Sequence, residues 1–208
     1  MNLPFKMRVT NNTERYRGDW FWGKEPETIA WIEGMTPGSR LWDIGANIGV
    51  YALYASHLGV EVWAFEPSNK NYQALLLNKE DNDFRNLSVV KRAISNRDGL
   101  SVFNEYFEAG MSGHSIGEGG RCCLESRGDT LVENGYPVPQ HIKIDVDGKE
   151  LDVLCGCEKM LSNVDSLCVE VNNWSIVSWL GSRGFHEDLR YTVLKRAGGL
   201  NIIFRREL

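Results

Sequence analysis

The chain has 208 residues, of which 42% are hydrophobic and 25% charged, a length and balance typical of a globular protein with one sizeable core. Its formal net charge of −5 argues against a nucleic-acid partner, because contact with a phosphate backbone normally requires a basic face. No segment approaches the roughly 18 consecutive apolar residues of a membrane span, and the N-terminal segment lacks the apolar core of a signal peptide. We therefore expect a cytoplasmic protein, and nothing in the sequence indicates its oligomeric state.

The first half of the chain alternates between helical and extended patterns. Residues 1–35 form a polar and aromatic lead-in that closes with a short helix, since Ile29 and Ile32 repeat at helical spacing behind Pro26. Ser68 fits the N-cap of a later helix. The patterns predict strands at 41–45, 60–67, 87–95 and 100–107, helices at 47–59 and 68–82, and an irregular stretch at 108–121.

The second half continues this alternation and ends in two strands. The predicted elements are strands at 141–148 and 166–173, helices at 149–161 and 174–184, and final strands at 185–191 and 200–206 joined by a turn at 195–199. Strands separated by helices imply crossover connections, hence a mostly parallel sheet with helices on both faces. We expect one α/β domain over residues 1–208, with 1–35 as a cap, 36–208 as the core and a C-terminal antiparallel hairpin.

The stretch DIGANIG, from Asp43 to Gly49, contains more glycine than a simple turn requires. It follows a buried strand, and ligands of doubly wound sheets bind at such strand ends. Gly45 and Gly49 let the backbone approach a ligand, but Ala46 and Asn47 stand where the dinucleotide fingerprint G-x-G-x-x-G has its second glycine. A carboxylate at Asp43 repels a pyrophosphate and tolerates the ammonium and sulfonium of S-adenosylmethionine. We therefore favour S-adenosylmethionine over NAD.

Two further strand ends extend this predicted ligand site. Glu66 ends the next strand 23 residues after Asp43, where a carboxylate can accept both hydroxyl hydrogens of a ribose. Ala93 and Ile94 end the third predicted strand and could lie against an adenine, although many buried strands carry similar residues. Asp43 could instead cap a helix and Glu66 could be a solvated strand end, but the two acids together favour the ligand.

These motifs resemble the FkbM family of S-adenosylmethionine-dependent methyltransferases from about Asp19 to the C-terminus. The most specific are DIGANIG, FEP followed by Asn78, and KIDVDGKE, where Asp147 replaces the glutamate usual in the family. The resemblance implies a Rossmann-like methyltransferase fold with a seven-stranded sheet, S-adenosylmethionine as cofactor, and methyl transfer to a hydroxyl of a sugar, polysaccharide precursor or natural product. The residues expected to bind the cofactor are Asp43, Gly45, Ala46, Asn47, Gly49, Glu66, Pro67, Asn78, Ala93, Ile94 and Asp145.

Three residues are candidates for removing the acceptor's proton, the one step of methyl transfer that needs a base. Asp145 ends a predicted strand with Lys143 on the same face, and Glu170 ends the next strand. His114 lies in a Gly/Ser-rich loop of the kind that often forms a lid. The alternatives are helix capping for Asp145, a structural ion pair for Glu170 and simple exposure for His114.

Other functions remain as alternatives. Asp145, Glu170 and Asn172 carry oxygen ligands for a metal-assisted O-methyltransferase of a small diol, but their pattern departs from the Asp-Asp-Asn set of such enzymes and we expect no metal. A dehydrogenase is disfavoured because Tyr191 and Lys195, spaced as its catalytic pair, fall in the terminal hairpin. A non-catalytic nucleotide-binding Rossmann module would not require the intact motifs. Acceptor specificity is expected in residues 1–30 and 104–129.

Overall fold

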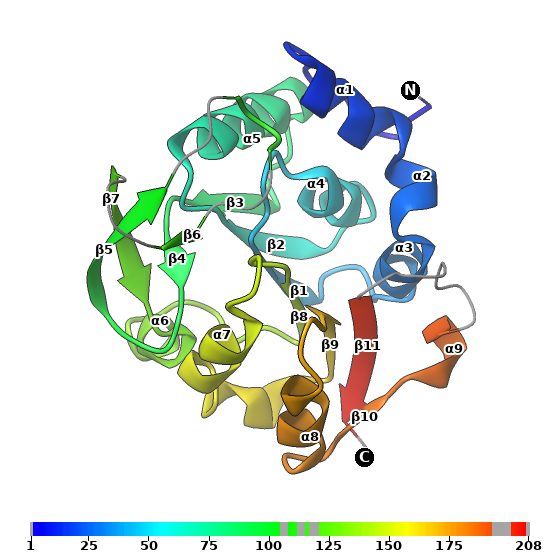
Figure 1. Ribbon diagram of the computed structural model, residues 1–208. Helices are drawn as coiled ribbons and strands as arrows, with labels where there is room; N and C mark the ends of the chain where they lie inside the picture. Colours follow the sequence, from blue (N-terminus) through cyan, green and yellow to red (C-terminus); the bar gives the residue numbers. More distant parts are fainter. Residues whose placement is uncertain (1, 105–107, 112–114, 117–120, 193–200, 207–208) are drawn as a thin grey trace.

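A seven-stranded sheet runs through the middle of the protein in the computed structural model, which describes residues 2–104, 108–111, 115–116, 121–192 and 201–206 (Figure 1). Its strands are β1 (Arg40–Ile44), β2 (Glu61–Phe65), β3 (Leu87–Val90), β8 (His141–Ile144), β9 (Ser166–Glu170), β10 (Phe185–Glu187) and β11 (Asn201–Arg206). Their order is β10-β11-β9-β8-β1-β2-β3, and only β11 runs antiparallel to its neighbours. The α/β fold, the mostly parallel sheet and the C-terminal antiparallel pair are therefore confirmed.

Helices cover both faces of this sheet, and each face has its own hydrophobic core (Figure 1). Side chains alternate along a strand, so neighbouring residues of β1 pack into different cores. Leu41 packs into the first core, and Trp42 and Ile44 pack into the second. The helices of the first face are α3 (Pro26–Glu33), α4 (Val50–His57) and α5 (Asn69–Asn82). Those of the second are α6 (Gly128–Glu133), α7 (Glu150–Gly156), the 3-10 helix η1 (Met160–Asn163) and α8 (Ser175–Gly181).

A smaller four-stranded sheet, which the sequence patterns did not predict, lies beside the large one (Figure 1). Its order is β4 (Ala93–Ile94), β7 (Arg121–Ser126), β5 (Gly99–Asn104) and β6 (Ser115–Ile116). The strand expected at 87–95 is therefore two strands in different sheets, because β3 pairs with β2 whereas β4 pairs with β7. The strand expected at 100–107 is β5 over the described residues 100–104, and the interval 108–121, expected to be irregular, contains β6 and the first residue of β7.

The C-terminal region departs from the prediction at one point. The strand expected at 185–191 ends at Glu187, and the chain turns into the short helix α9 (Leu189–Thr192). Asp188 explains the change, because its carboxylate accepts the backbone N–H of Arg190 at 3.3 Å, a local bond that competes with strand pairing. The turn predicted at 195–199 lies outside the described residues.

The N-terminal segment forms two helices, α1 (Asn12–Asp19) and α2 (Phe21–Lys24), that were not predicted. Asn11 caps α1, because its side chain accepts a hydrogen bond from the N–H of Glu14 at 2.9 Å. In return, the Glu14 carboxylate accepts the N–H of Asn11. Phe21 anchors α2, since it is only 1% exposed and packs against aromatic rings of α4. Within the described ranges, no helix combines the length and apolar character needed to cross a membrane.

The loops that follow β1 and β8 touch each other at the middle of the sheet. The strand order reverses between these two strands, which is where ligands of such sheets bind. Gly45 has a φ of 84°, and a Cβ there would lie 1.9 Å from the carbonyl oxygen of Asp145. Gly49 has a φ of 88°, and its Cβ would lie 2.1 Å from Cδ1 of Leu75 in α5. Contacts within the protein therefore exclude a side chain at Gly45 and at Gly49.

This contact predicts that Gly45→Ala will lower the free energy of unfolding by more than about 3 kcal/mol, because a left-handed φ alone costs an L-residue about 1–2 kcal/mol and the added methyl also meets backbone that cannot rotate away. Gly38→Ala is the matched control, since Gly38 has the same φ of 84° with nothing within 4 Å of its Cβ. It should lose only about 1–2 kcal/mol. Urea unfolding measures both variants, and equal losses would contradict the role given to the Asp145 contact.

Candidate active site

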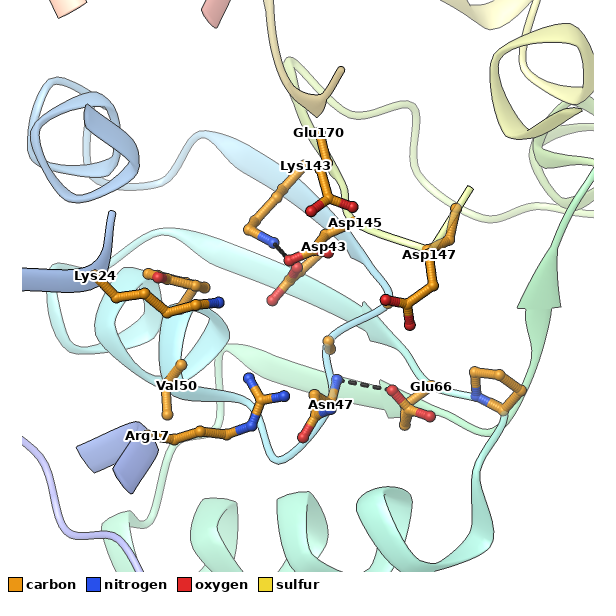
Figure 2. A pocket seen from close by; sticks show the side chains of 15 residues that line it. Arg17, Lys24, Asp43, Asn47, Val50, Glu66, Lys143, Asp145, Asp147 and Glu170 are labelled. Atoms are coloured by element: carbon orange, nitrogen blue, oxygen red, sulfur yellow. Dashed lines mark hydrogen bonds and ion pairs between the residues drawn. The ribbon is translucent and has the colours of Figure 1, made fainter. Parts of the chain in front are cut away.

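A cavity opens at the carboxyl ends of β1, β2, β8 and β9, on the face covered by α4 (Figure 2). The predicted site residues that line it are Asp43, Gly45, Ala46, Asn47, Glu66, Pro67, Asp145 and Glu170. The other lining residues are Arg17, Lys24, Val50, Tyr51, Lys143, Val146 and Asp147. Five carboxylates thus face three cations, so the cavity is acidic overall and suits a ligand with positive charge better than a pyrophosphate.

The sheet register places the charged residues of three strands side by side. Lys143 in β8 pairs with Asp43 in β1 on one side and with Cys168 in β9 on the other. Alternation along each strand then brings Asp145 and Glu170 to the same face, two residues beyond Lys143 and Cys168. Parallel strands end at one edge of the sheet, so these side chains meet where the cavity opens (Figure 2).

Lys143 and Asp145 form a buried ion pair. The Lys143 Nζ lies 2.9 Å from Oδ2 of Asp145, and the lysine side chain is only 2% exposed. Burial opposes its charge, but Asp145, Asp43 and Glu25 outweigh burial and raise the pKa of Lys143 above the ordinary lysine value. Burial likewise disfavours the Asp145 carboxylate, yet Lys143 lowers its pKa below the usual range. Asp145 therefore stays ionised and is a weak proton acceptor.

Asp43 is a buried acid whose side-chain oxygens are poorly satisfied. It is 1% exposed, and burial raises its pKa to about 6 even though Lys143 opposes the change. The N–H of Ala52 in α4 also favours its charged form. However, neither carboxylate oxygen has a hydrogen bond of normal geometry among the residues described. A buried carboxylate normally has such partners, so Asp43 is suited to a ligand that donates hydrogen bonds.

Glu66 ties the end of β2 to the loop after β1. Its Oε2 accepts the N–H of Asn47 at 2.7 Å and its Oε1 accepts the N–H of Ser68 at 2.8 Å. Burial raises the pKa of Glu66 to about 7, although these two N–H groups favour the charged form. Each oxygen keeps a second lone pair, so the carboxylate can still accept hydrogen bonds from ligand hydroxyls.

The backbone N–H groups of the DIGANIG loop are already bound within the protein. Gly45 and Ala46 donate to the carbonyl of Phe65, Asn47 to Glu66, Ile48 to the side chain of Asn47, and Gly49 to the carbonyl of Ala46. A loop that cradles phosphate instead points several unbound N–H groups at the anion. The arrangement therefore does not suit a pyrophosphate, in agreement with the acidic character of the cavity.

Glu170 stands at the rim of the cavity in a negative environment. It is partly buried, and burial together with Asp145, Glu150 and Asp147 raises its pKa to about 7, with Lys143 opposing. A carboxylate with this pKa can take a proton near neutral pH far better than Asp145 can.

Glu150 holds the loop that carries Asp145 and Asp147, a role that the sequence analysis did not recognise. It is fully buried at the start of α7, its Oε1 accepts the N–H groups of Val146 and Gly148 at 3.2 and 3.0 Å, and its Oε2 accepts Nδ2 of Asn172 at 2.7 Å. The only sequence signal was its place in the KIDVDGKE motif.

The amide of Asn172, a candidate metal ligand, is thus used to hold this loop through Glu150. In the part of the chain that the structure describes, no group of three or more His, Cys, Asp or Glu side chains is placed to hold a metal ion.

Several predicted residues lie outside the cavity wall. Gly49 packs against α5, and Asn78 is buried beneath the loop, where its Nδ2 donates to the carbonyl of Ile48 at 3.0 Å. Ala93 is buried in β4, and Ile94 lines a separate hollow with Ser95, Asn96, Arg97, Glu125, Lys149 and Asp152. His114 lies outside the described residues. The cofactor-binding and catalytic roles of the predicted residues stay predictions, including those of Gly49, Asn78, Ala93, Ile94 and His114.

The comparisons with known proteins agree with this site. Residues 43–186 match the methyltransferase FkbM domain, from Asp43 in β1 to His186 in β10. The chain is 33% identical over 143 residues to the hexuronic acid methyltransferase AglP of Haloferax volcanii, an alignment that covers 68% of this chain and 59% of that protein. The chain thus spans less than two thirds of the length of this relative.

Two solved methyltransferase structures have the same fold. The magnesium protoporphyrin IX methyltransferase of Synechocystis PCC 6803, with S-adenosylmethionine bound, has a TM-score of 0.57 at 12% identity and covers 97% of this chain and 87% of its own. The precorrin-6y C5,15-methyltransferase of Geobacter metallireducens has a TM-score of 0.56 at 14% identity, covering 99% and 95%. These likenesses bear out the Rossmann-like methyltransferase fold, and the match over residues 43–186 shows that the chain belongs to the FkbM methyltransferase family.

Proposed function

We propose that the protein is an S-adenosylmethionine-dependent methyltransferase that methylates a hydroxyl group of a sugar, a polysaccharide precursor or a natural product. The observation that carries the proposal is the buried Asp43 carboxylate, which faces an acidic cavity without a hydrogen-bond partner of normal geometry among the described residues. Membership of the FkbM family supports methyl transfer. The name of the Haloferax volcanii relative, a hexuronic acid methyltransferase, supports a sugar as the acceptor.

The residues present fit this cofactor. Asp43 would accept hydrogen bonds from its ammonium, and the remaining lone pairs of Glu66 would accept those of the ribose hydroxyls. Gly45, Ala46, Asn47 and Pro67 would line its path along the strand ends. When bound, S-adenosylmethionine supplies a methyl group on a positively charged sulfur, and the carboxylates of this cavity favour that charge.

Among the described residues, Glu170 is the candidate base that we favour for the acceptor's proton. It ends β9 beside Asp145, faces the same cavity and has a pKa raised to about 7 by burial and by neighbouring carboxylates. Asp145 would instead orient the acceptor, because its ion pair with Lys143 holds it in the ionised form. The chain's own contribution to catalysis is then chiefly to position the acceptor oxygen and remove its proton.

This proposal predicts that the protein binds S-adenosylmethionine and S-adenosylhomocysteine with micromolar affinity and NAD⁺ not measurably. Asp43→Asn and Glu66→Gln should each weaken the binding of both sulfur compounds roughly tenfold to a hundredfold, because each removes a charge-assisted hydrogen bond worth about 1.5–3 kcal/mol. Isothermal titration calorimetry measures the affinities, with Glu61→Gln at the exposed start of β2 as the control.

Binding of neither sulfur compound would refute the methyltransferase proposal. Loss of binding or turnover on addition of EDTA would support the metal-assisted alternative. Binding of the cofactor without transfer to any of a broad set of sugar and small-molecule hydroxyls would favour a non-catalytic module.

A second prediction concerns pH. The base must be ionised to accept a proton, so kcat/KM should rise with pH through about 7, where Glu170 loses its proton. Glu170→Gln should lower kcat by about 10²–10⁴-fold while the affinity for S-adenosylhomocysteine stays within about twofold of the wild-type value. Initial rates from pH 5 to 9, with the best acceptor from the screen, measure this. A Glu170→Gln variant that keeps the wild-type kcat would exclude Glu170 as the base.

A further inference from the structure

Two cationic side chains reach the cavity from outside the region that matches the family. Arg17 lies in the last turn of α1 and Lys24 at the end of α2, whereas the family match begins at residue 43. Both side chains line the cavity and extend into it from the side opposite Asp147 and Glu66 (Figure 2). The cavity therefore has a cationic wall formed by residues that precede the matched residues 43–186.

Aromatic packing and hydrogen bonds hold Arg17 and Lys24 beside the cavity. Phe21, between them in the sequence, is buried against Phe5 and Tyr54 with ring centroids 5.5 and 5.3 Å away, which holds the two helices on α4. Arg17 donates through Nε to the carbonyl of Gly110, and Lys24 Nζ lies 2.7 Å from Oε1 of Glu25. A guanidinium has five N–H donors and an ammonium three, so each group retains donors for a ligand.

The charges of Arg17 and Lys24 both act on Asp145 inside the cavity. Asp145 has a lowered pKa in spite of burial, chiefly because of Lys143, and Lys24 and Arg17 add to this effect. Neutral hydroxyl groups do not require two full positive charges for recognition. A carboxylate does benefit from them, since hydrogen bonds between ionised partners are about twice as strong as neutral ones.

We propose that Arg17 and Lys24 form an anion subsite for a carboxylate of the acceptor, so that the enzyme selects an acidic sugar over its neutral counterpart. The inference rests on the proposed methyltransferase function. The cofactor's methionine end also carries a carboxylate, which is the competing occupant. The origin of the subsite in helices that precede the family domain favours the acceptor, because the strand-end residues proposed for the cofactor lie inside that domain.

The test is a two-stage calorimetric experiment on the full chain. In the first stage, S-adenosylhomocysteine is titrated into the wild type, Arg17→Met, Lys24→Met and the control Arg15→Met, which changes an exposed cation of α1 that does not line the cavity. In the second stage, each protein saturated with S-adenosylhomocysteine is titrated with methyl glucuronide, galacturonide and mannuronide and with the three corresponding neutral methyl hexosides.

We expect at least one uronide to bind the wild type at least about tenfold more tightly than its neutral partner, a difference of about 1.4 kcal/mol. Arg17→Met and Lys24→Met should each reduce that preference to within about threefold and leave the affinity for S-adenosylhomocysteine within about twofold, and Arg15→Met should change neither. Because Arg17 also binds the backbone of Gly110, Lys24→Met provides an independent test that removes no backbone contact.

Two results would overturn the inference. Equal affinity of the wild type for every charged and neutral pair would remove the anion subsite. A tenfold loss of S-adenosylhomocysteine binding in the Arg17 or Lys24 variants would assign these cations to the cofactor. Failure of the wild type to bind S-adenosylhomocysteine in the first stage would instead refute the methyltransferase proposal itself, so the two failures are distinguishable.

Discussion

The ammonium of Lys143, buried at the centre of the sheet, binds one carboxylate directly and neutralises others nearby. It lies 2.9 Å from Asp145, is the strand partner of Asp43 and stands 5.0 Å from the ring centroid of Tyr51. Removing one member of a buried pair typically costs about 3–5 kcal/mol, because the remaining charge is left uncompensated. Without Lys143, the two acids would repel each other, and one of them would be expected to take up a proton. Lys143 thus favours the negatively charged forms of both Asp43 and Asp145 at the wall of the cavity.

The two loops beside this lysine behave as one structural unit. The backbone of Asp145 approaches Gly45 so closely that no side chain fits between them, and Glu150 fixes the same loop through three hydrogen bonds. Glu66 secures the other side through the N–H of Asn47. Preorganisation of this kind would suit the proposed methyl transfer, since holding donor and acceptor in line can lower a barrier by about 7–11 kcal/mol.

Sequence patterns located the seven strands of the large sheet and the acids at their ends, although the expected strand 87–95 also took in β4 and the expected strand 185–191 ran beyond β10. Hydrophobic runs bounded by turn residues located β1, β2, β8 and β9. Parallel strands bring their carboxyl ends together, so the sequence alone groups Asp43, Glu66, Asp145 and Glu170. The small sheet was not predicted as a unit, because β4 and β6 have only two residues each and because no local pattern indicates that β5 pairs with β7 outside the large sheet.

The remaining parts of the site depend on tertiary contacts. Arg17 and Lys24 belong to short helices whose position is set by the burial of Phe21, and no local spacing indicates that they face a cavity formed after residue 43. Glu150 resembles an ordinary acid in the first turn of a helix until its three hydrogen bonds are seen. The preference for Glu170 over Asp145 as base likewise required the structure, because it depends on which of the two binds Lys143.

The family match begins at residue 43, but the folded domain begins earlier in the chain. The core on the α4 face is closed by side chains that precede residue 43, among them Phe5, Phe21, Trp31 and Ile32, each at most 7% exposed. A fragment cut to residues 43–186 would lack β11 and would leave the apolar surface of α4 uncovered, and exposed patches of that kind promote association with other chains. The N-terminal segment is therefore an integral layer of the protein, and a minimal expressible unit must include it.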